Sequence, residues 1–187
     1  MRTQKRTMFY FLLMGLLAGG CFLISSPAPA EDTPSGSSQE VNQLLSEVKT
    51  EAIALERDCD EIATWTSTMG LSWQSHASNL IRISEHFNRA GRLLKQLQDV
   101  RHTASPWQQQ AIDGIYPLLK QLDDNTEAMI NHLNDNQSRI HFSPYTDYAK
   151  AGHELARDLA SLVSNYVEYG NLEVEFHRLQ DKLDSAS

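Results

Sequence analysis

The stretch VNQLLSEVKTEAIALERDCDEIATWTSTM, residues 41–69, decides the fold class of this chain. Its apolar and small residues recur at alternating steps of four and three positions. The positions in phase are Val41, Leu45, Val48, Ala52, Leu55, Cys59, Ile62, Thr66 and Met69. This spacing aligns them along one face of a helix, in the a/d pattern of a helix that packs against others over about four heptads. The stretch therefore predicts a long amphipathic helix over residues 39–68.

The same spacing recurs in three later segments. The second seam is Trp73, His76, Leu80, Ile83, Phe87, Ala90, Leu94 and Leu97. The third is Ile115, Leu119, Leu122, Thr126, Met129, Leu133, Asn136 and Ile140, and the fourth is Tyr145, Tyr148, Gly152, Leu155, Leu159, Leu162, Tyr166 and Tyr169. We expect helices over residues 73–102, 106–138 and 144–169, with a C-terminal extension over 171–184. No segment alternates apolar and polar residues at period two, so no sheet is expected.

Helix-boundary signals separate these segments. Gly70 is a stop signal and Ser72 a suitable N-cap, while Ser-Pro pairs at 105–106 and 143–144 each put an N-cap before a proline suited to the first helical position. The intervening loops are only a few residues long, so consecutive helices must run in opposite directions. We predict an all-α, antiparallel up-down-up-down four-helix bundle with coiled-coil-like packing over residues 39–187.

Three features depart from the regular pattern. Pro117 inside the third helix removes a backbone hydrogen bond and clashes with the carbonyl four residues back, so a kink is expected there. Gly170-Asn171 is a helix-stop signal within the fourth seam, so residues 171–184 are expected to form a bent extension or a separate short helix. Residues 31–38, EDTPSGSS, are rich in Pro, Gly and Ser and predict a flexible spacer.

Residues 1–30 have the three-part layout of a secretory signal peptide. Three basic residues come first, an apolar run covers residues 8–24, and SSPAPA ends in an A-x-A arrangement at Ala30. We predict cleavage after Ala30 and an exported protein, periplasmic or secreted. Two alternatives remain open: a lipoprotein lipidated at Cys21, where AGGC is similar to a lipobox at its small residues, and an uncleaved N-terminal anchor. Either would bring membrane contact through the N-terminal segment alone.

The chain is acidic, with 16 basic residues, 24 acidic residues and a net charge of −8. Loss of residues 1–30 would remove three basic residues and no acidic one, leaving 13 basic against 24 acidic and a net charge of −11. Such a chain lacks the basic footprint of a nucleic-acid-binding protein. Cys59 would then be its single cysteine, which excludes an internal disulfide, and its place in the first seam predicts a buried thiol.

Seven histidines make a metal site the most specific chemical hypothesis. Folding the helices about their loops brings His76 of the second helix close to His132 of the third, at the end that also holds Met69 and His141. A cluster of imidazole and thioether ligands suits copper or zinc, so these four residues are the candidate ligands. In the alternative interpretation, His76 is a seam residue with one ordinary hydrogen-bond partner, and His132 and His141 face water.

Sequence motifs for other chemistry are absent. There is no Glu-x-x-His pair for a di-iron centre, no CxxCH for c-type haem, and no HExxH, G-x-S-x-G or P-loop motif. We therefore expect a non-enzymatic, cofactor-free protein of the cell envelope that acts in protein–protein interaction or scaffolding, with an envelope protein as its partner. The alternative is a periplasmic metal- or haem-binding bundle that uses the histidine-rich end.

Overall fold

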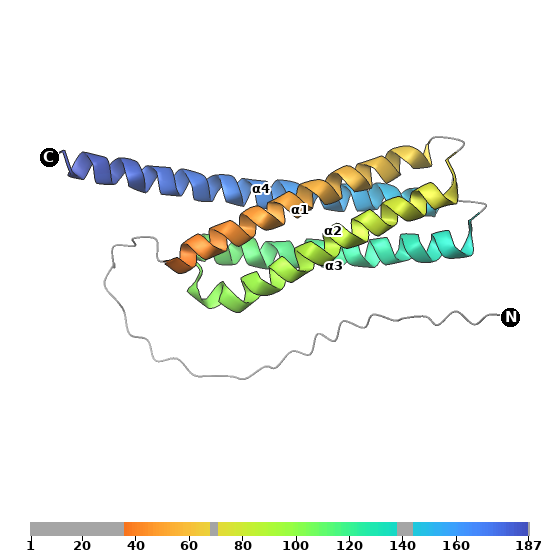
Figure 1. Ribbon diagram of the computed structural model, residues 1–187, viewed down its shortest axis with the longest axis horizontal. Coiled ribbons are helices and arrows are strands. Elements are labelled where there is room, and N and C mark those ends of the chain that lie inside the picture. The colour runs from red at the N-terminus through yellow and green to blue at the C-terminus, as the bar shows by residue number, and fades with distance from the viewer. Residues whose placement is uncertain (1–35, 68–70, 138–143, 187) are drawn as a thin grey trace. The chain divides into compact units, whose positions relative to one another are not determined.

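The computed structural model describes residues 36–67, 71–137 and 144–186. Over these ranges the chain is all-helical, with four α-helices, one short 3-10 helix and no strand. The elements are α1 (Gly36–Thr66), α2 (Trp73–Val100), η1 (Arg101–Thr103), α3 (Pro106–Asp135) and α4 (Tyr145–Asp184). Figure 1 shows consecutive helices running back and forth beside one another, as in a helical bundle. The predicted signal peptide, residues 1–30, lies outside the described residues.

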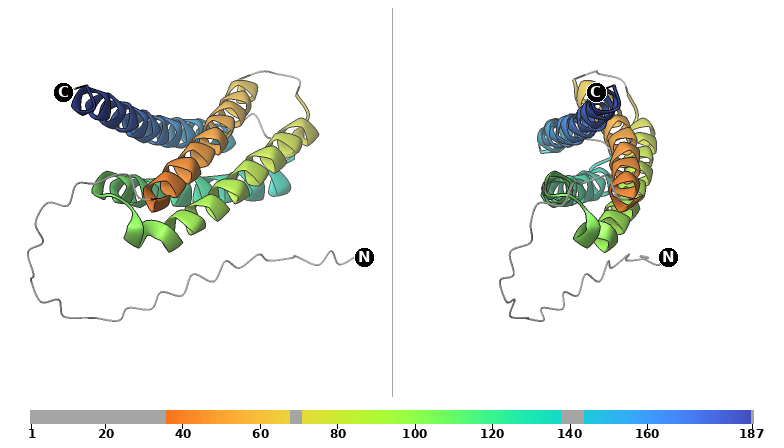
Figure 2. Two further views of the ribbon diagram at one scale, coloured as in Figure 1. Left: turned by 60° about the vertical axis from the view of Figure 1, so that its left-hand side comes forward. Right: turned by 90° about the vertical axis from the view of Figure 1, so that its left-hand side faces the viewer.

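Each helix of the bundle contacts two main neighbours. α1 packs against α2 and α4, and α3 packs against α4 and, less extensively, α2 (Figure 2). The core between them is mostly aliphatic, and Leu45, Leu55 and Ile62 on α1 are almost wholly buried. Among the described helices, none combines the length and the apolar character needed to cross a membrane.

The first seam matches the burial seen in α1. Its eight members from Val41 to Thr66 are all buried, while Met69 lies outside the described residues. The helix begins at Gly36, so residues 36–38, which the sequence assigned to the flexible spacer, belong to α1 instead. The a/d pattern identified the buried face because apolar residues repeat on it without interruption.

In α4 the buried face differs from the predicted seam. The buried residues are Tyr145, Ala149, Gly152, Ala156, Leu159, Ala160, Val163 and Gly170. The predicted Leu155 and Leu162 are only half-buried, and Tyr169 is exposed. Small side chains let α4 approach its neighbours closely: a Cβ at Gly152 would lie 2.8 Å from Nδ2 of Asn125 on α3. The prediction favoured the larger apolar residues, whereas close helix contact selected the smaller ones.

α4 is one uninterrupted helix of 40 residues, so the expected break at Gly170-Asn171 does not occur. At 1.5 Å per residue it is about 60 Å long. Its last turns continue past the ends of the other helices (Figure 1). We call residues 171–186 the α4 extension.

The helix starts follow the serine and proline signals with one shift. Ser72 Oγ accepts a hydrogen bond from the Ser75 N–H at 3.4 Å, and Pro106 is the first residue of α3. α4 begins at Tyr145, one residue after the predicted position, with Pro144 preceding it. Pro117 lies within α3, which continues through it.

Candidate functional site

His76 is a fully buried core residue at one end of the bundle. Its Nδ1 lies 3.1 Å from the hydroxyl oxygen of Tyr145 at the start of α4, and the two rings meet edge-on with centroids 5.4 Å apart. The ring of Trp65 on α1 also meets the His76 ring edge-on, with the two centroids 5.6 Å apart. Burial raises the pKa of Tyr145, so its hydroxyl stays protonated. This cluster joins α1, α2 and α4.

His132 contacts the same tyrosine from α3. Its ring lies nearly parallel to that of Tyr145, at 30° and a centroid distance of 5.9 Å. The side chain is half-buried, and its Nε2 is buried with no hydrogen-bond partner among the described residues. The expectation that His132 faces water is met only in part, because the side chain is half-buried.

The candidate metal ligands are brought only partly together. His76 and His132 share Tyr145 as a neighbour, while Met69 and His141 lie outside the described residues. Across residues 36–67, 71–137 and 144–186, no group of three or more His, Cys, Asp or Glu side chains could hold a metal ion. The Nδ1 atom of His76 lies within hydrogen-bond distance of the Tyr145 hydroxyl. The described residues therefore do not supply a complete set of ligands for copper or zinc.

An ionic network joins α1 to α2. Glu51 Oε2 lies 2.7 Å from His86 Nδ1, and both Glu51 carboxylate oxygens accept from Arg89 Nε at 3.0 Å. Burial would raise the pKa of Glu51, but the hydrogen bonds from His86 and Arg89 outweigh burial and hold the pKa below its ordinary value of 4.5. Glu51 is therefore a carboxylate at neutral pH and links the two helices.

A buried aspartate continues this network. The Asp58 side chain is only 2% exposed and lies 3.5 Å from Arg82 Nε and 3.8 Å from His86 Nε2. One turn along α1, Glu61 accepts from Asn79 Nδ2 at 2.8 Å and also pairs with Arg82. A buried carboxylate is costly unless it is paired, so these contacts specify how α1 and α2 align.

Sequence reasoning missed this network, although a signal for it exists. Glu51, Asp58, Asn79 and His86 all occupy the g position of their heptads, next to the a/d seam. In an antiparallel pair, g positions of the two helices face each other. The midpoint in sequence between Glu51 and His86 falls between positions 68 and 69, and the midpoint between Asp58 and Asn79 falls at the same place. Pairing g positions about the first loop would have predicted the contact between Glu51 and His86.

A shallow depression of about 570 Å³ lies over the α1–α2 network. It is lined by Arg57, Asp58, Asp60, Glu61, Thr64, Trp65 and Arg82. Its buried carboxylate, Asp58, lies 3.5 Å from Arg82 Nε and is paired with that arginine. We interpret the network as the structural link between these helices.

Trp107 occupies the opposite end of the bundle from His76. Its Nε1 donates to Glu173 at 2.8 Å, and its ring stacks on Tyr166 at 13° and meets Tyr169 edge-on at a centroid distance of 5.3 Å. A Cβ added at Gly170 would lie 2.8 Å from Cη2 of Trp107. The glycine therefore serves close approach of α3 to α4 and does not end the helix.

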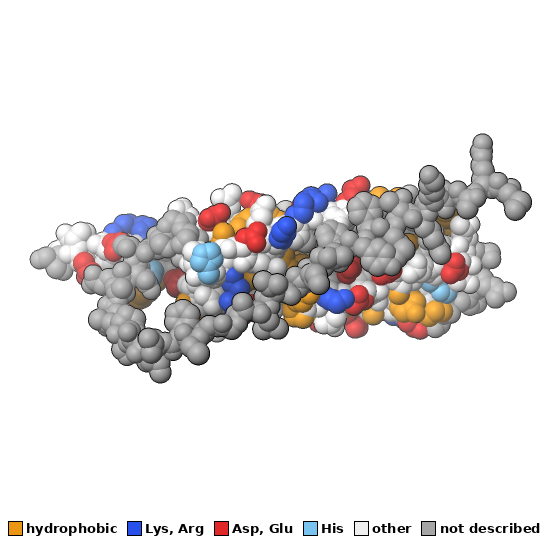
Figure 3. All heavy atoms as spheres, turned by 90° about the horizontal axis from the view of Figure 1, so that it is seen from below, with side chains coloured by type: hydrophobic (Ala, Val, Ile, Leu, Met, Phe, Trp, Pro, Cys, Tyr) orange, Lys and Arg blue, Asp and Glu red, His pale blue; other side chains and the backbone are white. Residues whose placement is uncertain are grey.

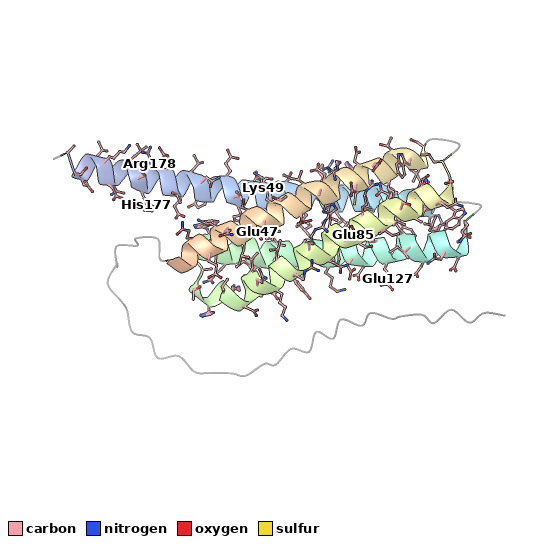
Figure 4. All side chains as sticks on the ribbon, in the orientation of Figure 1. Glu47, Lys49, Glu85, Glu127, His177 and Arg178 are labelled. Atoms are coloured by element: carbon pink, nitrogen blue, oxygen red, sulfur yellow. The ribbon has the colours of Figure 1, made fainter. Side chains whose placement is uncertain are left out.

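The α4 extension exposes the large apolar side chains of Leu172, Val174, Phe176, Leu179 and Leu183, each at least 48% exposed. Tyr169, just before the extension, is 52% exposed. Figure 4 shows His177 and Arg178 on this part of α4, past the end of the other helices. On the face of the molecule seen in Figure 3, acidic, basic and apolar side chains are interspersed. Comparisons of the chain with protein-family models, with curated proteins and with solved structures found no match.

Proposed function

We propose that this protein is a non-enzymatic interaction protein of the cell envelope, in which a four-helix bundle presents the α4 extension to another protein. One observation carries the proposal: a row of large apolar side chains, each between 48% and 70% exposed, on a helix that leaves the bundle. Contiguous exposed apolar surface is uncommon on soluble proteins and marks interaction sites.

The spacing of these residues supports a helical partner surface. Tyr169, Leu172, Phe176, Leu179 and Leu183 follow one another at steps of three and four, so they lie within one stripe of the helix. Val174 lies on roughly the opposite side. A stripe of this kind is how a helix docks into an apolar groove or pairs with a second helix.

Charge argues against a lipid surface as the occupant. The α4 extension carries four acidic residues, Glu173, Glu175, Asp181 and Asp184, and two basic residues, Arg178 and Lys182. Helices that lie on anionic membranes carry mainly Lys and Arg on their polar face. The acidic extension therefore favours a protein partner.

Two sequence features support the rest of the proposal. The basic, apolar and small-residue layout of residues 1–30 supports export with cleavage after Ala30. The four-and-three spacing of the buried residues on α1 supports coiled-coil-like packing of the bundle, and the short loops between helices support its antiparallel direction. The proposed activity requires no cofactor.

Site-specific photo-cross-linking in the producing cells tests the proposal. A photoreactive residue at position 179 is expected to give an adduct of discrete mass, whereas the same residue at position 174 is expected to give none. Both positions are exposed on the same helix, which makes Val174 the matched control. Absence of any adduct from positions 172, 176 and 179 contradicts the interaction. Sequencing of the mature N-terminus tests export, and a cytoplasmic chain that retains residues 1–30 contradicts it.

A further inference from the structure

We propose that the partner is a second copy of this chain, and that two α4 extensions pair antiparallel as a short two-stranded coiled coil. This inference rests on the proposed function and names the occupant of its surface. The heptad assignment puts Tyr169, Phe176 and Leu183 at a, and Leu172 and Leu179 at d.

One antiparallel register satisfies these positions in both copies. Phe176 of one copy faces Leu179 of the second, and Leu172 faces Leu183 of the second. The two contacts, Phe176 with Leu179 and Leu172 with Leu183, have the same midpoint in the sequence, between residues 177 and 178. A twofold axis at that point therefore generates each contact twice, once from each copy. An interface of two identical patches related in this way is the usual form of a homodimer.

Charges beside the stripe favour the antiparallel orientation. Glu175 and Lys182 occupy the g positions, and g faces g across an antiparallel pair, so each Glu175 meets Lys182 of the second copy. A parallel pair would instead put Glu168 beside Glu173 of the second copy, which is repulsive. The chain already uses this rule internally, because the g-position residues Glu51 and His86 pair across the antiparallel helices α1 and α2 at 2.7 Å.

The apolar area is sufficient for a weak dimer. Each of the five stripe residues is between 48% and 70% exposed. Pairing would bury on the order of 100 Å² for each of the four residues in the two layers, or about 800 Å² over both copies, and Tyr169 at the edge would add to this. Specific interfaces begin near this size, so the dimer is expected to dissociate on dilution.

Sedimentation equilibrium of the purified protein, with its N-terminus established by sequencing, tests the inference. The mass of the wild type should rise with concentration from one chain to two. Phe176→Glu should keep the protein monomeric, and Val174→Glu, on the other side of the same helix, should leave the dimer intact. Circular dichroism of both variants confirms that the bundle is folded.

A charge exchange tests the register. Glu175→Lys alone, or Lys182→Glu alone, should raise the dimer dissociation constant about tenfold, because each makes two like-charge contacts. The double variant Glu175→Lys/Lys182→Glu restores opposite charges between copies and should recover the dimer. Failure of this recovery overturns the antiparallel register.

The remaining outcomes separate this inference from the proposed function. A protein that stays monomeric, while position 179 cross-links in cells to a different protein, overturns self-association and leaves the interaction function standing. Binding to lipid vesicles in place of a second copy also overturns the inference. A dimer that Phe176→Glu does not weaken uses another surface, which overturns the assignment to the stripe. A monomer with no adduct in cells contradicts both proposals.

Discussion

Gly170→Ala is expected to destabilise the bundle, although alanine is the better helix former. The new Cβ would lie 2.8 Å from Cη2 and 3.2 Å from Cζ2 of Trp107. Carbon atoms in contact prefer about 3.5–4.0 Å, so the ring or the helix must move. The ring is held by stacking on Tyr166 and by the hydrogen bond from its Nε1 to Glu173 at 2.8 Å, so movement sacrifices both contacts.

The opposing contributions can be compared. Replacing a helical glycine by alanine gains about 1 kcal/mol. Overpacking at a fixed neighbour costs about 1–3 kcal/mol, and loss of the indole hydrogen bond costs about 1 kcal/mol more. The expected net change is a loss of about 1–3 kcal/mol of unfolding free energy, equivalent to a fall in melting temperature of about 3–9 °C for a domain of this size.

Thermal and urea unfolding followed by circular dichroism measure this change, with Gly91→Ala in α2 as the matched control. Nothing lies within 4 Å of a Cβ added at Gly91, so that variant should gain up to about 1 kcal/mol. The double variant Gly170→Ala/Trp107→Leu should lose less than the sum of its two single changes, because the clash is gone. If Gly170→Ala raises stability as Gly91→Ala does, Trp107 does not pack against this glycine.

Two further predictions concern buried and titrating groups. Burial raises the pKa of Cys59 to about 12, so a thiol reagent should label it slowly in the native protein and rapidly after denaturation; rapid native labelling would put the thiol on the surface. The pKa of Glu51 is lower in the folded protein than its ordinary 4.5, so the stabilisation from Glu51 should be complete above about pH 4.5 and be lost as the pH falls through the folded pKa. Glu51→Gln should flatten the acid side of the melting-temperature profile relative to wild type, and an unchanged slope would show that the contacts of Glu51 with His86 and Arg89 do not stabilise the fold.

The seam of α1 could be predicted because it depends on local periodicity. Every turn of this helix places an apolar residue on the same face, so the burial of Leu45, Leu55 and Cys59 follows from spacing alone. The start of α3 at Pro106 could be predicted equally well, because helix capping depends on a few adjacent residues.

The candidate sites depended on contacts that spacing within one helix does not reveal. The metal hypothesis placed His76 and His132 at one end of the bundle, but it did not anticipate that Tyr145 contacts both rings. To predict the α1–α2 network, residues on the two helices would have to be aligned with each other about the loop that joins them. Asp58 in particular lies next to the seam in the sequence, and only the packing of α2 against α1 buries it and pairs it with Arg82.

By itself, the sequence determined that the chain is helical, where most helices begin and which face of α1 is buried, because propensity, capping and periodicity act over a few neighbouring residues. The tertiary structure decided which face of α4 enters the core and what Gly170 does. Leu155 and Leu162 are more apolar than Ala149 and Ala156, yet the alanines are buried, since close contact between helices rewards small size as much as hydrophobicity. A glycine that signals a helix stop in isolation remains within α4 because Trp107, distant in the sequence, fills the space that its missing side chain leaves.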